Sequence, residues 1–381
     1  MTRLRVGVMD TALAARPIVD AATRASYLAA AAARVDSFWL PDHINSLLPR
    51  SLWTPRYCGG AALVPRVDAH LEPWTTLGYL GAHNWLGRLR LGVAVTDAGR
   101  RNPAVTAQAV TTLHRLTKGR AILGIGTGER EGNEPYGVDW SKPVARLEEA
   151  LATVRALWES AGQLVNRDSP YFPLRDALFD LPPHRGKWPQ IWVASHGPRM
   201  LRITGRFADA WFPYSPHVSA EYEQHLDVVR TAASDYGRDP MAITPALVAM
   251  VVTGRSRDDV DEAMDSELIK AWTLTAPGRL FARVGATHPL GAEFSGMQDL
   301  QPFTMDEESA LSHVSGVPVP AVQAAHLCGT PAEVVEQAAA WRDQGVRYLV
   351  VANLSALQRS LRKGLASSVA FSKILHGLKK L

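Results

Sequence analysis

An acid and an imidazole stand side by side at Asp42 and His43, directly after the apolar run that begins at Ser37. Histidine is the side chain best suited to give or take a proton near neutral pH. A neighbouring carboxylate can fix the imidazole tautomer and raise its pKa. The pair alone also fits a histidine held by backbone groups in a turn. It marks a candidate site of general acid–base catalysis, with His43 as the catalytic group.

A second group of such residues ends another apolar run and consists of Gly126, Thr127, Gly128 and Glu129. Glycines at this point would let a flat ligand or a phosphate approach the backbone. The glycine spacing resembles a dinucleotide-binding fingerprint, but Glu129 stands where that fingerprint requires its third glycine. A Rossmann site is therefore excluded, while a glycine-rich turn without function stays open.

A third group closes a further apolar run with Ala194, Ser195, His196 and Gly197. Pro198 and Arg199 follow, so exposed backbone N–H groups and the guanidinium could hold an anionic group. Pro198 is equally explained as the first residue of a helix. The pattern predicts a ligand-binding turn or a plain helix start.

Other chemistries find little support in the sequence. The 12 histidines include no His-Glu-x-x-His or Cys-x-x-Cys pairing, so we expect no metal site. Ser195 lacks the glycine-flanked turn of a hydrolase nucleophile. The tryptophans do not interleave with a strong basic run, so nucleic-acid binding is not expected.

The elements that must position these groups are short apolar runs, each followed by an Ala-rich or amphipathic stretch. This alternation is typical of a parallel sheet covered by helices. The predicted fold is a (β/α)8 barrel, in which the carboxyl ends of the strands form one mouth where active sites lie. The eight predicted strands span residues 5–10, 37–43, 89–97, 120–128, 190–196, 208–214, 243–253 and 347–354.

We expect a single domain over residues 1–381, because a barrel of about 250 residues with insertions accommodates this length. Two stretches, residues 45–73 and 286–322, do not fit a minimal barrel and are predicted as long loops at its mouth. Thr330, Pro331 and Glu333 predict a capped helix start. Residues 356–381 form a basic amphipathic segment, either a last barrel helix or a helix that touches an anionic membrane surface.

Bulk properties indicate a folded cytoplasmic protein. The apolar share is 46%, the charged share is 20% and the net charge is +4, all close to ordinary globular usage. The first residues lack the apolar region of a signal peptide, and no apolar run is long enough to span a membrane. Cys58 and Cys328 lie far apart in the sequence, which fits a reducing compartment.

In this order the motifs resemble the coenzyme F420-dependent branch of the luciferase-like family, and the match covers most of the chain. The residues that carry the resemblance are 5–8, Trp39 with Asp42 and His43, 91–96, 102–104, 123–129, Asn133 with Glu134, and 194–198.

The resemblance implies a barrel of the bacterial luciferase-like type with a deazaflavin at its mouth. It implies a non-proline cis peptide bond between Ala94 and Val95, behind the ring. His43 would be the acid or base, Glu129 a second group for proton transfer, and Asp42 a contact of the coenzyme. The remaining coenzyme site would consist of Ala94, Val95, Thr96, Gly126, Thr127, Gly128, Ala194, Ser195, His196 and Gly197.

The substrate side departs from the sugar-phosphate dehydrogenases of this branch. Those enzymes hold a phosphate with Thr and Lys after the sixth strand, where this chain has aromatic residues. We expect an apolar substrate rim formed by Trp53, Trp211, Phe212 and Tyr214. Within the family the chain is most similar to reductases of long-chain lipid ketones, which implies hydride transfer from reduced F420 to a keto group.

Two other functions stay open. The same barrel could be an FMN-dependent monooxygenase, with FMN in place of F420, or a ligand-binding barrel without catalysis. We further expect a homodimer. The expected location is the cytoplasm, and peripheral contact with the inner face of the membrane is the alternative to a protein that stays in solution.

Overall fold

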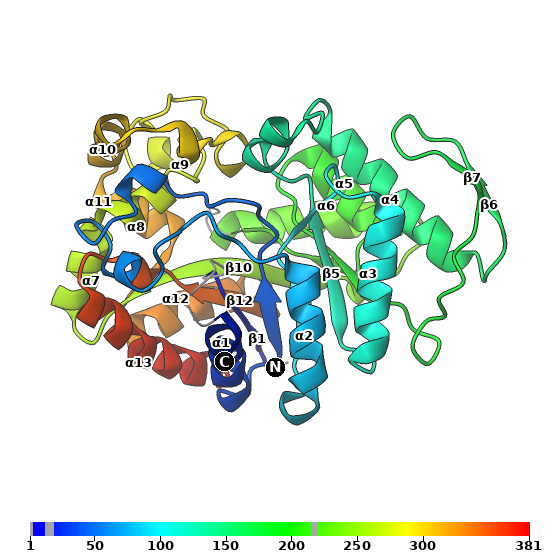
Figure 1. Cartoon of the computed structure of the whole chain (residues 1–381), viewed down its shortest axis with the longest axis horizontal. Helices are drawn as coiled ribbons and strands as arrows, with labels where there is room; N and C mark the ends of the chain where they lie inside the picture. The colour runs from blue at the N-terminus through cyan, green and yellow to red at the C-terminus, as the bar shows by residue number, and fades with distance from the viewer. Residues whose placement is uncertain (1–2, 12–18, 215–218) are drawn as a thin grey trace.

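The computed structural model describes residues 3–11, 19–214 and 219–381. Parallel strands form a barrel, and helices surround it (Figure 1). The (β/α)8 prediction is confirmed, since a strand lies within each of the eight predicted ranges. The barrel strands are β1 (Arg5–Met9), β2 (Ser37–Leu40), β3 (Arg90–Val93) continued by β4 (Thr96–Asp97), β5 (Ala121–Gly126), β8 (Gln190–Val193), β9 (Ala210–Trp211), β10 (Thr244–Thr253) and β12 (Tyr348–Asn353).

The barrel closes through parallel pairing of β9 with β10, of β10 with β12, and of β12 with β1. All of these strands therefore end at one mouth. A short strand, β11 (Leu327–Gly329), pairs with β10 outside this circuit. An antiparallel hairpin of β6 (Val165–Arg167) and β7 (Leu174–Ala177) projects from one side (Figure 1). Neither β11 nor this hairpin was predicted from the sequence.

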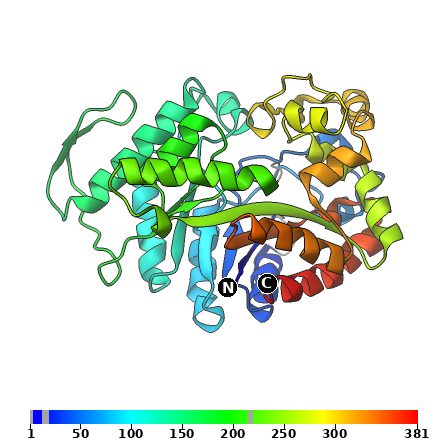
Figure 2. The same cartoon turned by 180° about the vertical axis from the view of Figure 1, so that it is seen from behind.

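Helices cover the outside of the barrel, as the view from behind also shows (Figure 2). They are α1 (Val19–Ala32), α2 (Pro73–Gly87), α3 (Pro103–Leu116), α4 (Pro143–Glu159), α5 (Pro198–Phe207), α6 (Ser219–Asp235), α7 (Arg257–Asp265), α8 (Glu267–Thr273), α9 (Gly278–Arg283), α10 (Glu307–Ser315), α11 (Val319–Ala325), α12 (Pro331–Asp343) and α13 (Leu361–Leu378). The predicted cap of α12 is present, since Thr330 and Glu333 form a reciprocal capping box.

Alternation along the strands separates two apolar cores. Phe38 and Leu40 of β2 point outward and pack with the covering helices, whereas Trp39 between them points into the barrel. The Trp39 ring lies 5.1 Å from that of Trp192, measured between centroids. A Cβ on Gly92 would overlap the Trp39 ring. The large aromatic side chain is thus accommodated by a neighbouring strand that has no side chain at the facing position.

The two predicted loops differ in outcome. Residues 45–73 contain only the short 3₁₀ turns η1 (Arg50–Leu52) and η2 (Gly59–Ala62) before α2 begins. Residues 286–322, however, include α10 and part of α11, so the prediction of an irregular loop there was wrong. These helices have 9 and 7 residues, and the hydrophobic period is read reliably only over a window of about 11–18 residues.

The C-terminal segment forms η8 (Leu354–Leu357) followed by α13, within the range predicted for a basic helix. Among the described residues, no helix combines the length and apolar character needed to cross a bilayer. Cys58 and Cys328 are both buried free thiols.

Candidate active site

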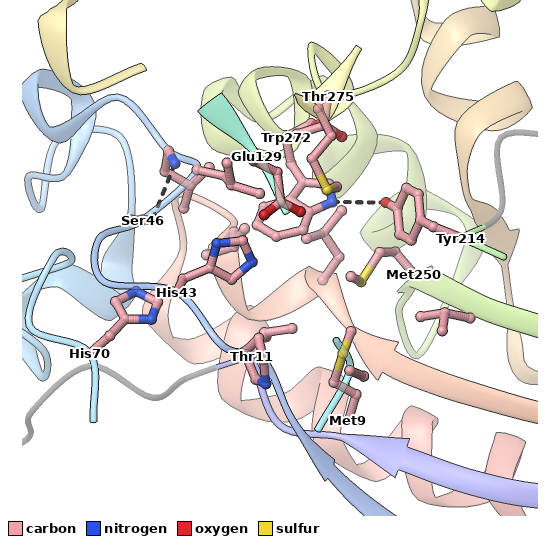
Figure 3. A pocket seen from close by; sticks show the side chains of 18 of the residues that line it. Met9, Thr11, His43, Ser46, His70, Glu129, Tyr214, Met250, Trp272 and Thr275 are labelled. Atoms are coloured by element: carbon pink, nitrogen blue, oxygen red, sulfur yellow. Dashed lines mark hydrogen bonds between the residues drawn. The ribbon is translucent and has the colours of Figure 1, made fainter. Parts of the chain in front are cut away.

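A cavity of about 650 Å³ opens at the carboxyl ends of the barrel strands. Its lining includes residues that follow β1, β2, β5 and β8, together with residues of η2, α8 and α13. Figure 3 shows His43 on one side of this space and Tyr214, bonded to Trp272, on the other, with Glu129 drawn between them. The predicted site residues that line the cavity are His43, Trp53, Ala94, Val95, Gly126, Thr127, Gly128, Glu129, Ala194, His196, Phe212 and Tyr214.

Small residues form part of the cavity wall. The peptide bond between Ala94 and Val95 is cis, as the resemblance implied. A Cβ on Gly126 would lie 3.0 Å from Cγ2 of Val95 and 3.7 Å from the Cβ of Ala194. The side chains present thus leave a low apolar wall, which fits the face of a planar ring system.

The turn after β5 is fixed by buried polar contacts. Gly128 has a φ of +79°, and a Cβ there would collide with the carboxylate of Asp97. Nδ2 of Asn133 donates to that carboxylate at 2.5 Å and to the carbonyl oxygen of Glu129 at 2.7 Å. These bonds hold the backbone of Glu129 in the position from which its side chain reaches the cavity.

His43 is joined to a carboxylate that the sequence reasoning did not select. Its Nδ1 lies 3.0 Å from Oε1 of Glu131, whose side chain is fully buried. Burial lowers the pKa of His43, but the hydrogen bond with Glu131 and the charges of Glu129 and Glu131 raise it to about 9. The imidazole is therefore a cation at neutral pH, with Nδ1 turned to Glu131 and Nε2 left for a ligand in the cavity.

Glu129 has the opposite character. Its burial raises its pKa to about 7, and the charges of Glu131 and Asp97 act in the same direction, while His43 opposes them. A carboxyl group with this pKa is partly protonated near neutral pH and can exchange a proton with a neighbour. The site thus holds an imidazolium and a carboxyl group with shifted pKa values, as sites of proton transfer do.

Two polar side chains of the facing wall, Tyr214 and His196, are uncharged. Nε1 of Trp272 donates to the hydroxyl of Tyr214 at 3.0 Å, and burial raises the pKa of Tyr214 to about 12. Burial, aided by the charges of Arg279 and His225, lowers the pKa of His196 to about 4. Both groups are neutral at pH 7, so the charges at the cavity belong to Arg279 and to His43 with its carboxylates.

The model of the luciferase-like monooxygenase family matches residues 4–348. This chain belongs to the luciferase-like family. It is 66% identical over 381 residues, 100% of both chains, to the phthiodiolone/phenolphthiodiolone dimycocerosates ketoreductase of Mycobacterium sp. (strain JLS). The protein of the same name from Mycobacterium tuberculosis (strain ATCC 25618 / H37Rv) is 57% identical over 382 residues, again 100% of both chains.

Among solved structures, the fold is similar to that of an F420-dependent secondary alcohol dehydrogenase in complex with an F420-acetone adduct. The TM-score is 0.72 at 18% identity, and the match covers 99% of each chain. At this identity the likeness concerns the fold, which in both proteins is the luciferase-like barrel.

Asp42 does not line the cavity of this luciferase-like barrel. Its buried carboxylate pairs with Arg100 at 2.8 Å and with Arg101 at 3.1 Å. The hydroxyl of Thr96 donates to the same carboxylate at 2.6 Å, so Thr96 is turned away from the cavity as well. Burial raises the pKa of Asp42, but the two guanidinium groups outweigh it and hold the pKa below its usual value. Asp42 and Thr96 thus support the backbone beside His43 and do not contact the cavity.

Three further predicted residues lie outside the cavity lining. The hydroxyl of buried Ser195 lies 2.8 Å from that of Thr204 on α5, and Gly197 is exposed as the residue that precedes α5. Trp211 is fully buried against Tyr222 of α6, with ring centroids 4.5 Å apart. Strand alternation explains the last case, since Phe212 points into the barrel and its neighbour must point out.

Glu131 is the functional candidate that the sequence reasoning missed. It follows Glu129 by two positions, in a stretch that reads as an irregular loop. The 3₁₀ turn η3 (Arg130–Gly132) brings it back under His43, although the two residues are 88 positions apart. A second acidic residue beside Glu129 was the only available signal.

His43, Glu129 and Glu131 could also hold a cation, because their ligand atoms all lie within 4.8 Å of one another. One oxygen of Glu131, Oε2, is buried without a hydrogen-bond partner among the described residues. Two of these three groups, Glu131 and the His43 ring, are nevertheless already hydrogen-bonded to each other. The arrangement therefore suits proton transfer without a metal.

Proposed function

We propose that this chain is an F420-dependent ketoreductase that reduces the keto group of a long-chain lipid of the phthiodiolone type to the alcohol of the phthiotriol type. The observation that carries this proposal is the imidazolium of His43, held over the cavity by buried Glu131. The names of the full-length relatives supply the substrate class.

The residues around the cavity divide the work. Ala94, Val95, Gly126 and Ala194 would support the coenzyme ring, and the backbone at Gly128 lets the ligand approach closely. When bound, reduced F420 supplies the hydride that the carbonyl carbon of the substrate accepts. His43 orients the carbonyl oxygen and donates a proton from Nε2 as negative charge develops on that oxygen.

Glu131 and Glu129 support this proton transfer in different ways. Glu131 keeps the Nδ1 side of the imidazole engaged, so only Nε2 faces the substrate. Glu129, with a pKa of about 7, is the second proton donor and can reprotonate the imidazole between turnovers. We propose that these three residues act without a bound metal, so dialysis against a chelator should leave turnover unchanged.

The apolar side of the cavity suits a lipid. Trp53, Phe212 and Tyr214 line it, and so do Leu47 and Leu48. The sequence after β9 contains aromatic residues in place of the Thr and Lys with which the sugar-phosphate dehydrogenases hold a phosphate.

We propose in addition that the protein is a homodimer and that it contacts the inner face of the membrane peripherally. Sedimentation equilibrium tests the first of these proposals, and the experiments of the next subsection test the second.

Equilibrium binding of oxidised F420, with FMN and NADPH as controls, is the direct test of the coenzyme. We expect F420 to bind with micromolar or tighter affinity and the other two to bind at least tenfold more weakly. Preference for FMN, with O2 consumption on reduction, would favour the monooxygenase that the family description names.

His43→Ala then separates catalysis from binding. We expect kcat for ketone reduction to fall by about 10²–10⁴ with F420 affinity unchanged, because general acid catalysis contributes about that much. A wild-type protein that binds F420 but reduces no ketone, with binding lost in His43→Ala, would instead support a non-catalytic ligand-binding barrel.

A further inference from the structure

Among the described residues, the cavity reaches the surface at two places that differ in chemistry. A side chain that lines the cavity and is also well exposed marks a place where the cavity reaches the surface. One such place is polar and consists of Arg279, Ser295 and Gln298. The other is mainly apolar, since Leu63 and Leu365, which are 50% and 59% exposed, line the cavity there with exposed Ala356 and a single exposed hydroxyl, that of Ser368.

The apolar opening lies between the η2 segment and α13. Gly59 is so close to α13 that a Cβ there would overlap the backbone of Leu361. Beyond this contact, Gly60 and Val64 line one side of the cavity, and Gly364 and Leu365 of α13 line the other. Packed chain segments therefore hold the sides of the opening in place.

The outer face of α13 continues this apolar opening. Arg362, Leu365, Val369 and Lys373 follow one another at intervals of three or four residues and so share one face of the helix. All four are exposed, and Val369 is 59% exposed. Apolar residues flanked by cations on one helix face are typical of helices that lie in the surface of an anionic membrane.

The cations on this face differ from their neighbours. Lys363 pairs with Glu262 at 2.5 Å, and Arg359 pairs with Glu267. Within the described part of the chain, Arg362 and Lys373 take part in no ion pair. Their charges are thus available to phosphate groups outside the protein.

The cavity volume also requires an exit. A pocket of about 300–1,000 Å³ takes one drug-sized ligand, and this cavity of about 650 Å³ must hold the coenzyme ring together with a keto group. Long hydrocarbon chains attached to that keto group therefore have to leave the cavity. Leaving through an apolar opening into a bilayer avoids exposing them to water.

We propose that the opening between Leu63 and Leu365 is the portal for the hydrocarbon chains of the lipid ketone, and that the outer face of α13 seats this portal on an anionic bilayer. The proposal rests on the ketoreductase function given above. Arg362 and Lys373 contact lipid phosphates, Leu365 and Val369 enter the acyl boundary, and the keto group reaches His43 while its chains stay in the membrane.

The seating is tested by co-sedimentation with vesicles of phosphatidylglycerol and phosphatidylcholine. The double variant V369D/K373E removes apolar contact and reverses one charge without touching the cavity lining. We expect its vesicle affinity to fall at least tenfold, with turnover of a short soluble ketone unchanged. The matched control L178D/R175E makes the same changes on the β6–β7 hairpin, where Leu178 is 63% exposed, and should bind vesicles like the wild type. Equal binding by all three proteins, or no binding by the wild type, would refute the seating.

The portal itself is tested with Leu63→Trp, which narrows the opening. We expect kcat/KM for a long-chain ketone to fall about tenfold more than kcat/KM for a short ketone. Binding of a long-chain ketone with a pyrene at its chain end, followed by fluorescence, should weaken in parallel. Equal losses for both ketones, or unchanged binding of the labelled lipid, would place the chains elsewhere. Because the vesicle and pyrene measurements need no turnover, they still support or refute the portal if the wild type reduces no ketone at all.

Discussion

Nδ1 of His43 lies 3.0 Å from Oε1 of Glu131, a carboxylate with no solvent-exposed surface. A carboxylate oxygen of Glu129 lies within 4.8 Å of the same two side chains. A buried carboxylate bonded to one ring nitrogen fixes which nitrogen meets the substrate. The proposed reaction depends on this relationship, because it sets both the direction and the pKa of the proton donor.

Glu131→Gln tests that dependence. The neutral amide removes a charge that helps to raise the pKa of His43 to about 9, so the pKa should move back toward 6.5. We expect the alkaline limb of the kcat/KM profile for ketone reduction to shift to lower pH and the rate at pH 8 to fall about 10- to 100-fold. Glu134→Gln changes an exposed carboxylate in the same loop and should leave the profile unchanged. An unshifted limb in Glu131→Gln would mean that Glu131 does not control the His43 proton.

The raised pKa values of His43 and Glu129 each give a contribution to stability that falls as the pH rises, whereas buried neutral histidines such as His196, whose pKa is lowered to about 4, give one that rises between about pH 4 and 6.5. The pKa of His43 is raised from 6.5 to about 9 in the folded protein, and that of Glu129 from 4.5 to about 7. Each therefore stabilises the fold fully below its unfolded pKa and loses this contribution as the pH rises through its folded pKa.

Thermal unfolding between pH 4.5 and 9 measures this effect. From Glu129 we expect a loss between about pH 4.5 and 7, and from His43 a loss between about pH 6.5 and 9, together on the order of a few degrees in Tm. Because the histidines act alike in both proteins, the difference in Tm between Glu129→Gln and the wild type isolates the Glu129 contribution, and we expect it to change by a few degrees between pH 4.5 and 7 and little above pH 7. A difference that stays constant from pH 4.5 to 7 would contradict the pKa shift of Glu129, and a wild-type Tm that does not fall between pH 7 and 9 would contradict that of His43.

Gly128→Ala should damage both the fold and the coenzyme site. Gly128 has a φ of +79°, and a Cβ would collide with the Asp97 carboxylate. We expect a loss of about 2 kcal/mol or more in unfolding free energy, from left-handed backbone strain and the clash together, and at least tenfold weaker F420 binding. Gly137→Ala is the matched control, because its φ is +74° but a Cβ there meets no heavy atom within 4 Å. It should cost about 1 kcal/mol and leave F420 binding intact. Equal effects of the two substitutions would show that the Asp97 contact is unimportant.

Asp42→Ala distinguishes support of the backbone from contact with the coenzyme. The Asp42 carboxylate faces Arg100 and Arg101, so its removal leaves the partly buried Arg100 guanidinium without this carboxylate and Arg101 with Glu72 alone. We expect unfolding free energy to fall by about 3–5 kcal/mol. F420 affinity, measured on the folded fraction, should change less than threefold. A protein of wild-type stability with much weaker F420 binding would instead restore Asp42 to the coenzyme site.

Several features of this protein could be determined from the sequence alone. Apolar runs with polar ends predict both the barrel and its mouth, because strands buried on both faces need a continuous apolar pattern. His43, Glu129 and Gly126 could be identified for the same reason, since each stands at the end of a predicted strand or directly after it, and the barrel brings all such positions together. The cis bond at Ala94–Val95 was accessible only through resemblance, because no local pattern encodes it.

The tertiary structure decided which of the neighbouring side chains face the cavity. Asp42 and His43 are adjacent in the sequence, yet Arg100 and Arg101 hold the first outside the cavity and Glu131 engages the second. Loops arranged in space make these contacts, across separations of 58 to 88 residues. The same holds for α13, whose leucines line a cavity formed by strands far away in the sequence. Local pattern fixes where a strand ends, whereas packing between distant segments fixes which polar groups are paired and which remain free for chemistry.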